Sequence, residues 1–208
     1  MKKILFHLML CFCAVCFCSA DLQAQTVNFS EPVDGELSGN NLSPTDLLIF
    51  GVGNNTVGGT VDNATGATPN VDVFTFDIAA GTQLDTFSLN IFNSADNLAF
   101  VGIDDSNAFP FNATQLGAPG GPDQTQFIGG LLFGALGDIT GPISNGGIGT
   151  GFSAPLGPGE YSVYVQQIGG TTVEYEFGFS VSEAIPEPGS AIFLGLALAG
   201  FAAKRRRR

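Results

Sequence analysis

Apolar and polar residues alternate along several segments in the middle of the chain, and this period of two predicts β-strands. The clearest case is residues 71–78, where the two faces carry different sets of side chains. One face holds Phe74, Phe76 and Ile78, and the other holds Val73, Thr75 and Asp77. Residues 84–92 alternate in the same way after a turn at Ala79-Ala80-Gly81. Both segments are therefore expected to be strands with one apolar face.

Residues 159–181 contain the second strong pattern. Tyr161, Val163 and Val165 alternate with polar residues, and Gly169-Gly170 follows as a turn. The next segment has an apolar residue at every second position, at Val173, Tyr175, Phe177, Phe179 and Val181. Two alternating segments separated by a Gly-containing turn are typical of a β-hairpin, so we predict that these two strands pair.

Shorter apolar or β-branched segments predict further strands at residues 26–30, 47–52, 56–61 and 98–103. Residues 109–158 are rich in Gly and Pro, with one apolar block at 127–136, and form either irregular edges or binding loops. No segment before residue 190 has the apolar period of a helix of normal length. The fold class expected from these patterns is all-β, as an antiparallel β-sandwich with jelly-roll-like topology.

The first 20 residues have the pattern of a secretory signal peptide. Lys2 and Lys3 precede an apolar run that ends at Phe17, and small residues then suit cleavage after Ala20, or alternatively after Ala24. We therefore expect a signal helix in residues 1–20, export through the Sec translocon, and removal by signal peptidase. All four cysteines lie inside this segment, so the cysteine count carries no information about disulfides in the exported protein.

The chain ends with three features in order. Pro186-Glu187-Pro188 forms a stiff, exposed break, because proline fixes φ and lacks an N–H. Residues 191–203 carry no charge. As a helix this segment is about 20 Å long, shorter than the ~30 Å apolar layer of a bilayer. The basic cluster that follows consists of Lys204, Arg205, Arg206, Arg207 and Arg208. Such a cluster stays in the cytoplasm, which predicts an inner-membrane anchor with the domain of residues 21–185 outside.

This order of proline motif, short apolar helix and terminal arginine cluster resembles the PEP-CTERM sorting signal of Gram-negative bacteria. The resemblance covers residues 186–208. It implies recognition by an exosortase, a membrane cysteine transpeptidase, with cleavage near Pro186-Glu187-Pro188. It also implies a final position at the cell surface or outside the cell, and an association with exopolysaccharide and biofilm. An ordinary tail anchor is the alternative.

The charges are separated along the chain. All 19 acidic residues lie between Asp21 and Glu187, whereas the seven Lys and Arg residues lie in the two terminal signals. The single histidine is His7. The region 21–185 thus has no Lys, Arg, His or Cys, which excludes nucleic acid as a partner because nothing neutralises its phosphates. Catalysis that needs His, Cys or Lys is excluded as well, and no catalytic residue is assigned.

The acidic residues include one candidate metal site. Asp104 and Asp105 lie in a turn with two further oxygen-bearing side chains, which are the ligand atoms that Ca²⁺ prefers. The spacing does not match an EF-hand, so a calcium site competes here with an ordinary solvated turn. Asp72 and Asp77, which lie near the two ends of the strand at residues 71–78, make a weaker case.

Glu160, Glu174 and Glu176 are the residues that a glycosidase of two carboxylates would have to use. Glu174 and Glu176 share one face of a predicted strand, where like charges normally face solvent. We therefore expect a non-enzymatic surface or extracellular-matrix protein. A carbohydrate-binding module that uses Tyr, Asn, Gln and Asp is the alternative, and a carboxylate-only glycosidase is the third hypothesis.

Overall fold

The computed structural model describes residues 25–63, 69–95, 99–116 and 123–185 of the 208-residue chain. The predicted signal helix, the sorting motif Pro186-Glu187-Pro188, the predicted C-terminal helix and the basic cluster lie outside the described residues. Within the described ranges, no helix has both the length and the apolar character needed to cross a membrane.

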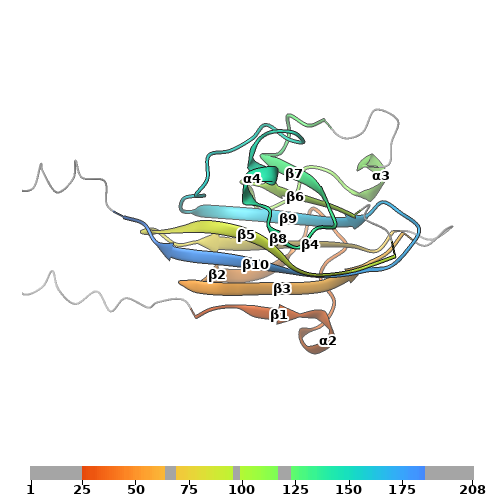
Figure 1. Cartoon of the computed structure of the whole chain (residues 1–208), viewed down its shortest axis with the longest axis horizontal. Helices are drawn as coiled ribbons and strands as arrows, with labels where there is room; N and C mark the ends of the chain where they lie inside the picture. Colours follow the sequence, from red (N-terminus) through yellow and green to blue (C-terminus); the bar gives the residue numbers. More distant parts are fainter. Residues whose placement is uncertain (1–24, 64–68, 96–98, 117–122, 186–208) are drawn as a thin grey trace, which may run out of the picture.

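The described residues form two five-stranded sheets (Figure 1). Sheet A has the order β1-β3-β10-β5-β8, and sheet B has the order β2-β4-β9-β6-β7. The strands of sheet A are β1 (Asn28–Ser30), β3 (Gly53–Val61), β5 (Thr82–Asn93), β8 (Gly137–Asp138) and β10 (Val173–Glu183). The strands of sheet B are β2 (Thr45–Phe50), β4 (Val71–Ile78), β6 (Ala99–Asp104), β7 (Gly129–Phe133) and β9 (Gly159–Gln167). The short helices are α2 (Glu31–Asp34), α3 (Ala113–Leu116) and α4 (Thr140–Ser144). The all-β prediction is therefore confirmed for the described residues.

Each sheet is mixed, so the prediction of a purely antiparallel fold is wrong at one edge of each. β1 pairs in parallel with β3, and β2 pairs in parallel with β4. Parallel neighbours need a long connection. Here the chain leaves β1, passes through β2 in sheet B and returns to β3, and it leaves β2 for β3 before it reaches β4. The other pairs are antiparallel and join β3 to β10, β4 to β9, β5 to β8 and β6 to β7, with β10 also beside β5 and β9 beside β6.

The predicted hairpin at residues 159–181 is also wrong, although both of its strands exist. β9 pairs with β4 and β6 in sheet B, whereas β10 pairs with β3 and β5 in sheet A. Residues 168–172 carry the chain from one sheet to the other. Five residues are long enough to span the ~10 Å between packed sheets. Alternation had identified the buried face of each strand, but it carries no information on which strand lies beside it.

The two sheets pack face to face over an aromatic core. Phe74 and Phe76 of β4 meet Phe179 of β10 with ring centroids 6.2 and 5.2 Å apart, respectively. The five apolar residues predicted for one face of β10 are all at most 2% exposed. The face assignments made from alternation in β4 and β10 are therefore confirmed on their apolar sides.

A second aromatic cluster covers the outer face of sheet B. Phe109, Phe111 and Phe127 come from the Gly- and Pro-rich region and pack against Phe100 of β6 and Tyr164 of β9. Glycines in the strands make room for these rings: a Cβ on Gly102 would lie 2.5 Å from the Phe109 ring, and one on Gly130 would lie 3.0 Å from Phe100 and Phe127. This part of the region is thus a buried cover over a sheet.

Candidate functional site

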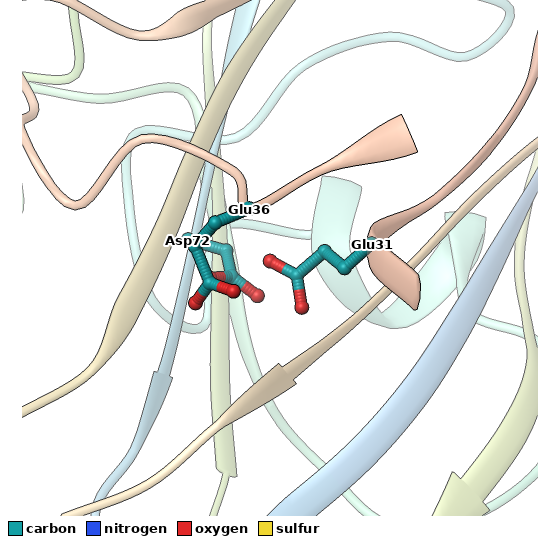
Figure 2. A group of neighbouring side chains, drawn as sticks. All are labelled: Glu31, Glu36 and Asp72. Atoms are coloured by element: carbon teal, nitrogen blue, oxygen red, sulfur yellow. The ribbon is translucent and has the colours of Figure 1, made fainter. Parts of the chain in front are cut away.

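Three carboxyl groups from distant parts of the chain meet beside β3 and β10. Glu31 opens α2, Glu36 follows α2, and Asp72 is the second residue of β4. One oxygen of each lies within 4.8 Å of an oxygen of the other two, and no other group of three acidic, His or Cys side chains has such spacing in the described residues. Figure 2 shows the three carboxyl groups pointing toward one another. We call Glu31, Glu36 and Asp72 the carboxyl cluster.

Asp72 is the most deeply buried member of the cluster. It shares the phase of Phe74 and Phe76 along β4, so its side chain lies on the core face of sheet B and is 0% exposed. The Tyr175 hydroxyl, which comes from β10 in sheet A, donates a hydrogen bond of 2.8 Å to Oδ2 of Asp72. Oδ1 of Asp72 is buried and has no hydrogen-bond partner. A buried acceptor without a hydrogen-bond partner destabilises the folded state, and Oδ1 of Asp72 is such an unsatisfied acceptor.

The surroundings of Asp72 favour its neutral form. Burial, and next the negative charge of Glu31, raise the pKa of Asp72 from 3.8 to about 8, while the hydrogen bond from Tyr175 acts in the opposite direction. Burial and the neighbouring Asp72 also raise the pKa of Tyr175. At neutral pH the cluster thus favours a proton, or another positive charge, at Asp72.

Glu31 is held in place by the backbone around it. Its Oε1 accepts a hydrogen bond from the Leu37 N–H at 3.0 Å, and its Oε2 accepts one from the Thr60 N–H of β3 at 2.7 Å. Pro32 suits the first turn of α2, because its missing N–H would have no helical partner there. Oε2 of Glu31 also accepts a hydrogen bond of 3.3 Å from the Thr60 hydroxyl. Glu31 thereby connects the N-terminal helix to sheet A, and its Oε1, which accepts a single hydrogen bond, keeps a lone pair free for a further ligand.

Glu36 approaches the cluster from the solvent side. Gly35 ends α2 with φ +100°, a conformation that favours glycine, and the chain turns back there. Glu36 is exposed, and its Oε1 accepts a hydrogen bond of 3.1 Å from the Asn70 side chain. The cluster therefore has one carboxylate in contact with water and two in the interior.

Gly59 of β3 leaves the space that the carboxyl groups occupy. A Cβ at this position would lie 2.8 Å from Oδ2 of Asp72 and 2.9 Å from Cδ of Glu31. Both of those groups are tied to other residues by the hydrogen bonds above, so they have little freedom to move away. Glycine at this position is required by the cluster itself.

The described part of the chain offers no basic side chain to balance this charge. Between His7 and Lys204 there is no Lys, Arg or His. Two unit negative charges 4.8 Å apart repel by about 3.5 kcal/mol at an effective dielectric constant of 20, a value that suits the buried Glu31 and Asp72. Water screens the exposed Glu36 more strongly. The counter-charge for this cluster must be a proton or an ion taken from solution.

The predicted calcium turn has a different environment. Asp104 ends β6 and is 7% exposed, and its Oδ2 accepts a hydrogen bond from the Ser106 hydroxyl. Burial raises the pKa of Asp104, while the Ser106 hydrogen bond lowers it. Asp105 is exposed. The structure brings no third carboxyl group to this turn within the described residues. The site at Asp104 and Asp105 stays a prediction.

The carboxylates considered for glycoside hydrolysis lie on strands. Glu174 and Glu176 follow one another on the outer face of β10 and accept hydrogen bonds of 3.1 Å from Asn93 and Asn90 of β5, respectively. Glu160 lies on β9 in the other sheet and pairs with Asp77 of β4. The two sheets thus keep Glu160 apart from the pair on β10, and catalysis by these groups stays untested.

The tyrosines proposed for sugar binding are in the interior. Tyr161, Tyr164 and Tyr175 are 6%, 0% and 1% exposed. None of them offers a ring face to a ligand at the surface, so the tyrosine part of the carbohydrate-binding hypothesis is wrong.

Sequence reasoning named Asp72 but ranked it below Asp104, and it did not name Glu31 or Glu36. One signal was available: Asp72 shares the phase of Phe74 and Phe76, so an acidic residue occupies a position of the apolar face. Glu31 lies 41 positions before Asp72 in the numbering (72 − 31), and no local pattern connects them.

Comparison with known proteins identifies the end of the chain. Residues 184–208 match the profile of the PEP-CTERM protein-sorting motif, and this match includes Pro186, Glu187, Pro188 and the basic cluster Lys204 to Arg208. A search of the curated proteins gave no match. The resemblance drawn from the sequence is confirmed, and the motif supports an exported protein that is sorted by an exosortase.

Proposed function

We propose that this chain is a surface or extracellular-matrix protein that an exosortase cleaves near Pro186-Glu187-Pro188 and releases from the inner membrane. The observation that carries the proposal is the match of residues 184–208 to the PEP-CTERM protein-sorting motif. Before cleavage, the signal peptide directs the chain to the Sec translocon and signal peptidase, and the apolar segment 191–203 holds it in the membrane. The basic cluster at residues 204–208 keeps the C-terminus in the cytoplasm.

The exported domain acts without catalysis in this proposal. Its support is chemical: residues 21–185 contain no Lys, His or Cys, so the common nucleophiles, general bases and imidazole ligands are missing. Association with exopolysaccharide and biofilm belongs to the same proposal, and it rests on the sorting motif alone.

We infer further that strands β3 to β10 form a jelly roll. The support is the pairing of β3 with β10, β4 with β9, β5 with β8 and β6 with β7. These pairs follow one another along a single long two-stranded antiparallel ribbon. The ribbon folds over to form two sheets, as in double-sheet jelly rolls. β1 and β2 then add one parallel strand to each sheet.

The sorting proposal is tested by replacing Pro186, Glu187 and Pro188 together with Ala in the natural host. The variant is expected to stay in the inner-membrane fraction with the mass of the uncleaved chain, because the protease loses its extended proline motif. Glu183→Ala, at the end of β10 and outside the motif, is the control and should be released normally. Normal release of the triple-Ala variant would contradict sorting through this motif, and the tail would then be interpreted as an ordinary membrane anchor.

The basic cluster gives a separate test of membrane orientation. With Arg205 to Arg208 changed to Ser, part of the population should expose its C-terminus outside, because Lys204 alone is a weak stop signal. A reporter fused to the C-terminus measures this fraction. A reporter that stays wholly cytoplasmic would contradict the role given to the arginines.

The matrix association is tested by fractionating a biofilm of the host. The released protein is expected to sediment with exopolysaccharide and to be found in the culture medium when polysaccharide synthesis is disrupted. Equal amounts in the medium with and without polysaccharide would remove this part of the proposal and leave the sorting part intact.

A further inference from the structure

We propose that Glu31, Glu36 and Asp72 bind a Ca²⁺ ion that fastens the N-terminal helix α2 to both sheets. Three observations on this cluster point to a ligand. The carboxyl oxygens converge within 4.8 Å, the fully buried Asp72 has an unpartnered oxygen, and the region 21–185 has no basic side chain to balance the charge.

The spacing of the oxygens suits one shared ion. Ca²⁺ binds oxygen ligands at about 2.3–2.6 Å, so two ligands of the same ion are at most about 5 Å apart. The oxygens of the cluster meet this limit. Oδ1 of Asp72 has no hydrogen bond to give up, and Oε1 of Glu31 keeps a lone pair beyond its single bond to Leu37.

The kind of ligand favours calcium among the divalent ions. All three side chains are carboxylates, which are hard ligands, and the cluster contains no His or Cys for zinc. Ca²⁺ accepts irregular sets of six to eight oxygens, and water at the exposed Glu36 supplies those that the protein does not. Mg²⁺ demands near-ideal octahedral geometry and gives up its water reluctantly, so a partly buried, irregular site suits it less.

The ion would add a further link between parts of the chain that already contact one another. Glu31 belongs to α2 and is bonded to β3 of sheet A, whereas Asp72 belongs to β4 of sheet B. Glu36 lies in the loop between α2 and β2. A single Ca²⁺ therefore connects both sheets and the N-terminal segment, and it replaces the proton that Asp72 otherwise needs.

The test is calorimetric titration of the full chain, purified in non-ionic detergent and freed of metal with EDTA, with CaCl₂. One saturable site per chain is expected. Asp72→Asn should weaken binding at least a hundredfold, since it removes the charge but keeps the shape of the buried ligand. Glu36→Gln should weaken it at least tenfold, and because Glu36 is exposed this variant keeps the fold even if Asp72→Asn does not.

The matched control is the double variant Asp104→Asn/Asp105→Asn, which removes two acidic groups outside the cluster. It should bind Ca²⁺ as the unchanged chain does, and MgCl₂ should bind at least tenfold more weakly than CaCl₂. The proposal is overturned by the absence of saturable heat, by Glu36→Gln binding with unchanged affinity, or by loss of binding in the control. Tighter binding of Mg²⁺ would overturn the assignment to calcium. Absence of saturable heat would leave a buried, protonated Asp72.

Discussion

Asp72 and Asp104 are two buried carboxyl groups on the same sheet, and their neighbours differ in origin. Asp104 shares the phase of Phe100 on the outer face of sheet B, and its partner, Ser106, is two residues away. Asp72 lies on the inner face, and its neighbours are Glu31, Glu36 and Tyr175, which come from distant parts of the chain. The Ser106 partner of Asp104 lies in a short stretch of sequence, although the Ile128 backbone also reaches Asp104. The environment of Asp72 exists only after two sheets and α2 have come together.

The pH dependence of stability should separate the two groups most strongly. In EDTA, the folded state holds a proton on Asp72 up to a pKa of about 8, whereas the unfolded chain releases it near 3.8. The folded state therefore binds more protons between these values. The free energy of unfolding should fall as pH rises from about 4 to about 8, by up to ~1.4 kcal/mol per pH unit. The groups that face Asp72 are Glu31, Glu36 and Tyr175.

Urea unfolding at a series of pH values measures this slope. Asp72→Asn should flatten it, because amide and carboxylic acid are both neutral and similar in shape. Asp104→Asn should leave most of it in place. The same slope in the Asp72→Asn variant would show that the cluster does not hold the proton.

The next largest effect is the gain in stability from calcium. A ligand at a hundredfold excess over its Kd adds about 2.7 kcal/mol to the free energy of unfolding. For a domain of this size that corresponds to a rise in Tm of about 5–10 °C. Differential scanning calorimetry in CaCl₂, and in NaCl of equal ionic strength, separates specific binding from screening of the acidic surface. Equal Tm values in the two salts would mean that neither Asp72 nor Asp104 belongs to a specific calcium site.

Gly59→Ala sharpens the comparison because it changes the space of the cluster and none of its charges. The new Cβ would lie 2.8 Å from Oδ2 of Asp72. Overpacking of this kind costs about 1–3 kcal/mol, and calcium affinity should fall with it. Gly157→Ala, where a Cβ meets no atom within 4 Å, is the matched control. Calcium titration and thermal unfolding of both variants measure the difference, and equal affinities would mean that the carboxyl groups move aside without loss.

Asp104→Asn should have the smallest effect. The amide oxygen still accepts the Ser106 hydrogen bond, so the change in the free energy of unfolding is expected to stay below about 1 kcal/mol, with calcium affinity unchanged. Chemical denaturation with and without CaCl₂ measures both quantities. A loss of calcium binding in this variant would reverse the comparison and restore the turn at Asp104 as the metal site.

Much of the fold follows from alternation, because a strand with one buried face shows that face in its sequence. The segment predicted at residues 71–78 has the bounds of β4. The segment predicted at 84–92 lies inside β5, and the one predicted at 98–103 is offset from β6 by one residue. The partners of the strands did not follow. Gly169-Gly170 is compatible with a tight hairpin and also with a crossing between sheets, and the packing of β9 on β4 and β6 decides between them.

The same limit explains the missed parts of the interior. Ser162, Tyr164 and Gln166 of β9 alternate with the core residues, as an exposed face would, yet all three are buried. For Tyr164 the reason is the cover formed by Phe109, Phe111 and Phe127, which lie in a Gly- and Pro-rich region without a period. Most of the carboxyl cluster was missed for the same reason: Glu31 and Glu36 carry no local signal, and only the place of Asp72 on the apolar face of β4 marks a member of the cluster in the sequence.

The direction of β10 places the carboxyl cluster and the start of the sorting motif toward opposite ends of the folded domain. The strand begins near Tyr175, beside the carboxyl cluster, and runs for eight residues to Glu183, a rise of about 26 Å. Figure 1 shows α2 at the end of β1 that lies away from the tip of β10. The sorting motif starts at residue 184. In a chain that is still anchored in the membrane by its tail, the cluster would therefore lie at the end of the domain that is farther from the membrane. That separation exceeds the ~8 Å Debye length at physiological salt, so the charge of the cluster is screened from the end of β10 where the sorting motif begins.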